Sequence, residues 1–108
     1  MINISFDFDG TLTDTHIRVL AEILLLVPQV QVFIITSRME KFGKDVYDLA
    51  KILKIPKERV CFTNNTPKAT FIKTFKESIY IHFDDDFFEI QQINNETSTK
   101  GILVDLYN

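Results

Sequence analysis

The acidic residues that could do chemistry fall into two short groups, each placed directly behind an apolar run. Asp7 and Asp9 follow the first run, and three consecutive aspartates, 84–86, follow a later one. Carboxylates that approach one another repel, and their pKa values rise unless a cation lies among them. An all-oxygen cluster of this kind suits Mg²⁺, which takes one or two carboxylates and keeps several waters. Mg²⁺ beside a free carboxylate points to phosphate chemistry, because the metal neutralises phosphoryl oxygens while the carboxylate attacks phosphorus.

The chain that must position these groups alternates between strand-like and helix-like segments. Runs rich in β-branched and aromatic residues predict strands over 2–8, 31–36, 59–63, 78–83 and 101–106. Helical spacing of apolar residues predicts helices over 16–27, 44–53, 67–75 and 87–93. The alternation predicts an α/β fold: a single three-layer, Rossmann-like domain with a central parallel sheet of about five strands and helices on both faces.

Two of the predicted helices have recognisable start signals. Pro67 suits the first helical position of the third helix, with Thr66 as its cap. Asp86 is expected to cap the last helix through its carboxylate. That role for Asp86 leaves Asp84 and Asp85 as the candidate ligands of the second acidic group.

The carboxyl ends of the strands are where a ligand site is expected, because ligands of open parallel sheets bind there. The chain leaves those ends at residues 7–11, 36–38, 63–65 and 84–86. If the first and fourth strands are neighbours, both acidic groups converge on one spot. Asp7 and Asp9 are separated by one residue of extended chain, so they point to the same side and can share that site.

Composition limits the class of protein. With 108 residues and few glycines or prolines, the chain is expected to form one domain, 1–108, without a linker. A net charge of −3 argues against a dedicated nucleic-acid binder, which normally has a basic face. The single cysteine, Cys61, lies in an apolar run and excludes an internal disulfide. No run approaches the length of a membrane span and no secretion signal is visible, so a cytoplasmic location is expected.

Four short motifs stand at or near the predicted strand ends: DFDGTLT at 7–13, IITS at 34–37, Lys68, and the pair Asp84-Asp85. The first matches the pattern DxDGT[LV]-T, the first motif of the haloacid dehalogenase (HAD) superfamily of phosphatases. The others resemble that family's second, third and fourth motifs, in the family's order. The resemblance covers essentially the whole chain and implies a Mg²⁺-dependent phosphomonoester hydrolase.

The resemblance implies a catalytic role for three of these residues. Asp7 would be the nucleophile that forms an aspartyl-phosphate. Asp9 would be the general acid that protonates the leaving group and then the base that activates water. Lys68 would neutralise charge on Asp7 and on the phosphate, with Lys73 and Lys76 as its rivals.

Phosphate-binding groups are implied in the same way. Thr36 or Ser37 would hydrogen-bond the phosphoryl oxygens, and the backbone N–H groups from Phe8 to Gly10 would cradle them. Arg38 follows the second motif directly. It is either a solvated loop residue or a contact to a second anionic group of the substrate.

The metal would be held by carboxylates from both acidic groups. The resemblance assigns this role to the Asp7 side chain, the backbone carbonyl of Asp9, and a carboxylate of the fourth motif. Asp84 is the first candidate there and Asp85 the second, and the order between them stays open. His82, two residues before Asp84, is expected to be a packed strand residue.

Members of this family often have a cap domain that covers the site, and here the intervals that would hold one are short. The stretches from Leu12 to Ile34 and from Arg38 to Lys68 are used up by predicted elements. We therefore expect a minimal, capless member with an open site. An open site suits a small phosphorylated substrate, a phosphorylated macromolecular end, or a homo-oligomer in which a second subunit covers it.

Two other functions share part of this pattern. A receiver-like phosphorylatable switch also gathers aspartate, threonine and lysine at a sheet edge, although its phosphorylated aspartate ends the third strand, where this chain has Thr63. A catalytically weak or inactive HAD-fold binding subunit is the other alternative. The intact set of Asp7, Asp9 and Asp84 favours the enzyme.

Overall fold

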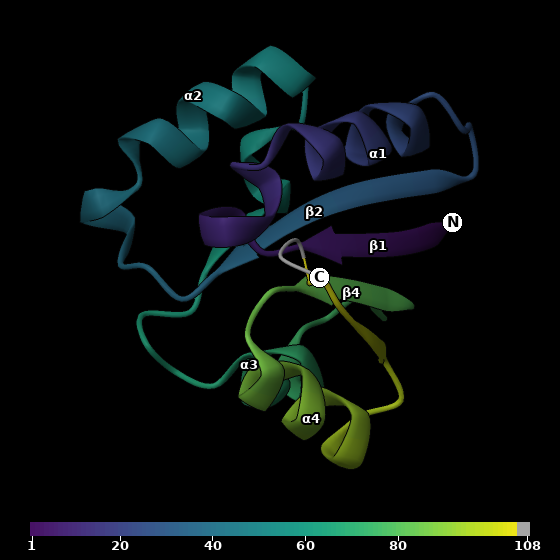
Figure 1. Ribbon diagram of the computed structural model, residues 1–108, viewed down its shortest axis with the longest axis vertical. Helices are drawn as coiled ribbons and strands as arrows, with labels where there is room; N and C mark the ends of the chain where they lie inside the picture. Colours follow the sequence, from purple (N-terminus) through teal and green to yellow (C-terminus); the bar gives the residue numbers. More distant parts are fainter. Residues whose placement is uncertain (106–108) are drawn as a thin grey trace.

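Five parallel strands form the central sheet of the computed structural model, which describes residues 1–105 (Figure 1). They are β1 (Ile2–Phe6), β2 (Val30–Thr36), β3 (Val60–Phe62), β4 (Ile81–Asp84) and β5 (Lys100–Leu103). Their order across the sheet is β3-β2-β1-β4-β5, and every neighbouring pair is parallel. β1 therefore lies between β2 and β4, so the strands that precede the two acidic groups are neighbours.

Helices cover both faces of this sheet. The longer ones are α1 (Thr15–Leu25), α2 (Lys44–Leu53), α3 (Lys68–Thr74) and α4 (Phe87–Glu96). Shorter helical turns are η1 (Phe8–Leu12), η2 (Glu40–Phe42) and η3 (Lys57–Arg59). Figure 1 shows α1 and α2 on one side of the sheet and α3 and α4 on the other. The predicted α/β class with a three-layer arrangement is confirmed.

The central strand β2 explains how one sheet supports two cores. Val32 and Ile34 pack with the residues of α1 and α2, whereas Phe33 and Ile35 pack with those of α3 and α4. Successive side chains of a strand point to opposite faces, so an unbroken apolar run supplies both cores at once.

β1 differs from β2, because only one of its faces is apolar. Ile4 and Phe6 belong to the core under α1 and α2, and the Phe6 ring stacks on that of Phe83 at 4.9 Å between centroids. The other face carries Asn3 and Ser5, both buried, in line with Asp7 beyond the strand end. A column of polar side chains thus runs under α3 and α4 toward the carboxyl edge.

Several element bounds differ from the predicted ones. Pro67 lies before α3 rather than at its first position, with φ −53° and ψ 136°, and the first helical N–H, that of Lys68, donates to the Glu89 carboxylate at 3.0 Å. The fourth strand begins at Ile81 instead of residue 78. The Ser78 carbonyl is engaged by the Asn3 side chain at 2.9 Å.

Other bounds agree more closely. α2 spans the predicted residues 44–53, and the Asp86 carboxylate caps α4 by accepting from the N–H groups of Phe88 and Glu89. α1 ends two residues before the predicted end, α4 continues three residues further, and β5 ends at Leu103. Val104 and Asp105, also predicted for that strand, lie beyond its end, and Leu106 lies outside the described residues. Within residues 1–105, no helix combines the length and apolarity that crossing a membrane would take.

The stacked pair of Phe6 and Phe83 provides a test of the fold. Phe6 is 0% exposed, so Phe6→Ala is expected to lower the free energy of unfolding by about 3–5 kcal/mol through lost burial and a cavity. Urea denaturation measures this change. Phe88 is 77% exposed, and Phe88→Ala is expected to shift stability by no more than about 0.5 kcal/mol. Equal losses for both variants would contradict the placement of Phe6.

Candidate functional site

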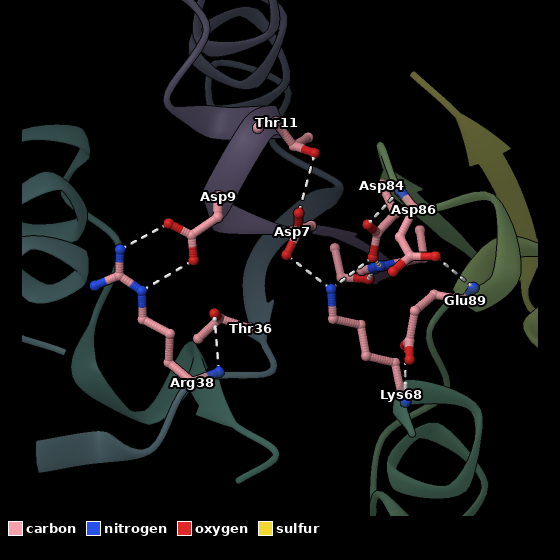
Figure 2. Close-up of polar contacts among 12 residues, drawn as sticks. Asp7, Asp9, Thr11, Thr36, Arg38, Lys68, Asp84, Asp86 and Glu89 are labelled. Carbon is pink, nitrogen blue, oxygen red and sulfur yellow. Dashed lines mark hydrogen bonds and ion pairs between the residues drawn. The ribbon is translucent and has the colours of Figure 1, made fainter. Parts of the chain in front are cut away.

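A polar cavity of about 220 Å³ opens at the carboxyl edge of the sheet, where β1, β2 and β4 end (Figure 2). Every side chain that lines it is polar: Asp7, Asp9, Ser37, Lys68, Asp84, Asp85, Asp86 and Glu89. Both acidic groups of the sequence meet here because β1 and β4 are paired neighbours. The predicted convergence of carboxylates at one sheet edge is therefore present.

The ammonium group of Lys68 joins the two acidic groups. Its Nζ lies 2.7 Å from Asp7 Oδ1 and 2.6 Å from Asp84 Oδ2, and the side chain is 3% exposed. α3 brings it there because Lys68 is the first residue of that helix. Lys73, one of the two other lysines considered from sequence, pairs with Glu96 on the surface. The structure thus brings Lys68 to Asp7 and leaves Lys73 outside the site.

Three carboxylates of this cavity are placed so that they could hold a cation. Oxygen atoms of Asp7, Asp84 and Asp85 lie within 4.8 Å of one another. Three carboxylates against the one ammonium of Lys68 leave an excess of two negative charges, which a single divalent cation would neutralise. Hard, all-oxygen donors are those that Mg²⁺ prefers, so the residues present fit this metal. Both candidates from the fourth motif, Asp84 and Asp85, belong to the group.

Burial and charge act differently on the two inner carboxylates. Burial raises the pKa of Asp7 to about 7, with Asp84 adding repulsion and the Lys68 ammonium only partly offsetting both. Burial also opposes the charge on Asp84, but the hydrogen bond from His82 and the Lys68 ammonium outweigh it and lower that pKa to about 2. The pKa of Lys68 is raised, because the attraction of Asp7 and Asp84 outweighs its burial. Without a metal, Asp7 therefore takes up a proton as the pH falls through about 7, while Asp84 stays ionised.

The turn η1 shapes the first motif around Asp85. Gly10 has φ +76°, in the left-handed region that glycine adopts freely, and a Cβ at this position would overlap the Asp85 carboxylate. Thr11 donates its hydroxyl to Asp7 Oδ2 at 3.2 Å, a contact for which the sequence assigned no role. The Gly10 N–H, expected to face a phosphate, donates to Thr13 Oγ1 at 3.0 Å. The ring of Phe8 packs in the core, so only the backbone of this residue is placed to contact a ligand.

The two hydroxyl residues of the second motif have different positions. Thr36 is fully buried, and its Oγ1 accepts from the backbone N–H of Arg38 at 3.3 Å. Ser37 lines the cavity. Of the two candidates for hydrogen bonding to a phosphoryl group, Ser37 is thus the one that reaches the cavity.

Arg38 is neither free in solvent nor turned toward an empty substrate position. Its Nε and one terminal nitrogen donate to the two carboxylate oxygens of Asp9 at 2.9 and 2.7 Å. The other terminal nitrogen donates to Asp45 and to the Phe42 carbonyl, and the guanidinium lies 5.1 Å from the Phe8 ring centre. These bonds raise the pKa of Arg38 further. Figure 2 shows the carboxylate of Asp9 directed at Arg38 and away from Asp7.

His82, expected to be only a packed strand residue, is fully buried but contacts the site. Its Nε2 lies 2.9 Å from Asp84 Oδ2, and its Nδ1 lies 2.7 Å from Ser5 Oγ. The sequence contained one signal for this contact. His82 and Asp84 are two residues apart at the end of a predicted strand, and such residues share a face.

Comparison with known proteins gives no relative: no family model, no curated protein and no solved structure matches this chain at a significant level. The case for a function therefore depends on the residues of the cavity and their geometry.

The raised pKa of Asp7 predicts how stability depends on pH. A carboxyl whose folded-state pKa is near 7 and whose ordinary value is 3.8 binds its proton more tightly when folded. Its contribution to stability therefore falls as pH rises from about 4 to about 7. Asp7→Asn lacks this titration. In EDTA, the melting temperature of Asp7→Asn minus that of the wild type is therefore expected to increase from pH 5 to pH 7.5.

Thermal melts across this pH range measure the difference between the two proteins. Asp48→Asn, which changes an exposed carboxylate on α2, is the control and is expected to show a constant difference from the wild type. A constant difference for Asp7→Asn as well would contradict the raised pKa. Saturating Mg²⁺ is expected to make this increase in the melting-temperature difference smaller, because a bound cation would compensate the charge of Asp7 in the wild type.

Proposed function

We propose that this protein is a Mg²⁺-dependent phosphomonoester hydrolase of the HAD type, acting through an aspartyl-phosphate on Asp7. The proposal depends on one observation. Asp7 and Asp84 share the Lys68 ammonium inside a polar cavity, and oxygen atoms of Asp7, Asp84 and Asp85 lie within 4.8 Å of one another. Asp7, Asp84 and Asp85 would hold Mg²⁺, which when bound neutralises the oxygens of a phosphoryl group.

Asp7 would carry the covalent step. An oxygen of its carboxylate attacks phosphorus, the ester P–O bond breaks, and Asp9 gives a proton to the leaving alkoxide. Asp9 then takes a proton from water, and the resulting hydroxide attacks the aspartyl-phosphate to release inorganic phosphate and restore Asp7. Lys68 keeps Asp7 oriented and balances charge. Ser37 lines the cavity and would donate its hydroxyl to the phosphoryl group.

The Asp9 carboxylate must separate from Arg38 before it can act as the general acid and base, because both of its oxygens accept hydrogen bonds from the guanidinium. The pair is accessible, with the side chains of Arg38 and Asp9 exposed by 26% and 56%. An incoming phosphate dianion competes with Asp9 for the guanidinium. Substrate binding would thus release the general acid beside the leaving group.

The dimensions of the cavity suit a phosphoryl group and its metal rather than a whole substrate. The cavity of about 220 Å³ is lined by no apolar residue, so an organic group of the substrate is expected to lie outside it. We therefore favour small phosphorylated molecules or the phosphorylated end of a macromolecule, with a second copy of the chain as a possible cover. The buried free thiol of Cys61 is in keeping with the cytoplasm as the location.

A receiver-like switch is the second candidate, and the Asp9–Arg38 pair is the observation that favours it. If Arg38 keeps Asp9 occupied, Asp7 could be phosphorylated but water would not be activated. The aspartyl-phosphate would then persist as a signal. The two functions differ in whether the wild type turns over.

The first assay is hydrolysis of p-nitrophenyl phosphate with Mg²⁺ and with EDTA. The wild type is expected to be active only with Mg²⁺, and Asp7→Asn is expected to be inactive because it lacks the nucleophile. Lys68→Met is expected to lose about 10²–10³-fold in kcat, since charge on Asp7 and the phosphate is no longer balanced. Lys73→Met, which changes a surface lysine of the same helix, is the matched control and should retain activity.

If the wild type neither hydrolyses the aryl phosphate nor binds beryllofluoride with Mg²⁺ at Asp7, the phosphoryl-transfer proposal is wrong. The inactive binding subunit then becomes the better description. Loss of activity in both lysine variants would remove the special role of Lys68.

Asp9→Asn separates the two chemical steps. Nitrophenolate leaves without needing a proton, so this variant is expected to release about one equivalent per protein and then stall at the aspartyl-phosphate. Stopped-flow absorbance measures the burst, and acid-quenched protein analysed by mass spectrometry shows the phosphoryl group. Steady turnover by Asp9→Asn at the wild-type rate would contradict the role of Asp9. A single-equivalent burst in the wild type itself would favour the switch.

A further inference from the structure

A serine and a histidine form a buried polar pair behind the carboxylates of the cavity. Ser5 on β1 and His82 on β4 face each other in the register of the two strands, and both are 0% exposed. Ser5 Oγ lies 2.7 Å from His82 Nδ1, and His82 Nε2 lies 2.9 Å from Asp84 Oδ2. The pair thus forms a continuous line from the sheet interior to Asp84.

The alternation of side chains along the two strands puts this pair on the same face as the site. Ser5 shares its face with Asp7, and His82 shares its face with Asp84. On the opposite face, the neighbouring Phe6 and Phe83 stack on each other. An apolar pair would avoid the cost of desolvating a hydroxyl and an imidazole in the sheet interior, so packing does not account for Ser5 and His82.

The direction of each hydrogen bond follows from the chemistry of the partners. Ionised Asp84 offers only acceptors, so His82 Nε2 must hold a hydrogen and donate it. With that hydrogen on Nε2 of the neutral ring, Nδ1 accepts from the Ser5 hydroxyl. Asp84 therefore sets the form of the imidazole, and the Ser5 hydroxyl holds the other ring nitrogen in place.

We propose that His82, oriented by Ser5, is a positioning residue that fixes the Asp84 carboxylate for the divalent cation. Oδ2 of Asp84 accepts from both His82 and Lys68, while Oδ1 accepts from the backbone N–H of Asp86 at 3.1 Å. These contacts hold both oxygens against rotation. The inference rests on the proposed metal site.

The other ligand of the fourth motif lacks such support. Asp85 is exposed, and no hydrogen bond holds its side chain within residues 1–105. Of the two carboxylates, Asp84 is therefore the one ordered before the metal arrives. Partners that orient a metal ligand raise metal affinity by lowering the cost of organising the site.

Two amides at position 82 separate positioning from packing. The amide nitrogen of His82→Gln reaches the place of Nε2 and can still donate to Asp84. The shorter amide of His82→Asn ends near the place of Nδ1, where it meets Ser5 but does not reach Asp84. Both variants bury one amide in place of the imidazole, while their contacts with Asp84 differ.

The test is the affinity of the full chain for Mg²⁺ alone, measured by isothermal titration calorimetry and by the Mg²⁺-dependent rise in melting temperature. His82→Asn is expected to bind Mg²⁺ about 10–100-fold more weakly than the wild type, and His82→Gln within a few-fold of it. Ser5→Ala is expected to fall between them. Phe83→Leu, which loosens the opposite face, should melt earlier with unchanged Mg²⁺ affinity.

Wild-type Mg²⁺ affinity in both His82→Asn and Ser5→Ala overturns the positioning role and leaves the proposed metal site intact. An equal loss of affinity in Phe83→Leu also overturns it, since general loosening would then explain the effect. If His82→Asn does not fold, Ser5→Ala decides alone. A wild type that binds no Mg²⁺ removes the proposed metal site and this inference together.

Discussion

The ammonium of Lys68 between Asp7 and Asp84 is the interaction on which the arrangement of the carboxyl edge depends. Two buried carboxylates this close would repel strongly, and removing one partner of a buried ion pair leaves an uncompensated charge. Lys68 also begins α3, and Glu89 on α4 accepts its backbone N–H. One residue thus connects β1, β4, α3 and α4 at the edge of the sheet.

This connection leaves the cavity short of positive charge. A single ammonium faces three carboxylates. Burial raises the pKa of Asp7 first, and repulsion from Asp84 and Asp85 raises it further against the attraction of Lys68. A cation that supplied the missing charge would lower the free energy of the folded state. In the function proposed above, metal affinity and reduced stability without the metal would therefore have the same origin, namely carboxylates held in place by a rigid sheet.

Arg38 organises the opposite side of the cavity in a comparable way. It connects η1 to the first turn of α2 by binding Asp9 and Asp45 at once, with its guanidinium near the ring of Phe8. The result is a resting arrangement in which Asp9 is held outside the group of Asp7, Asp84 and Asp85.

Local patterns in the sequence determined the elements, because strand alternation, helical spacing and caps are properties of neighbouring residues. The fold class, the bounds of α2 and the cap at Asp86 could be predicted in this way. So could the meeting of Asp7 with the second acidic group. Which residue faces the cavity was decided by the tertiary structure. The choice of Ser37 rather than Thr36, the pairing of Arg38 with Asp9, and the contact of His82 with Asp84 all depend on strand order, on register and on where each helix docks. These are set by packing between segments far apart in the chain, and no local pattern contains them.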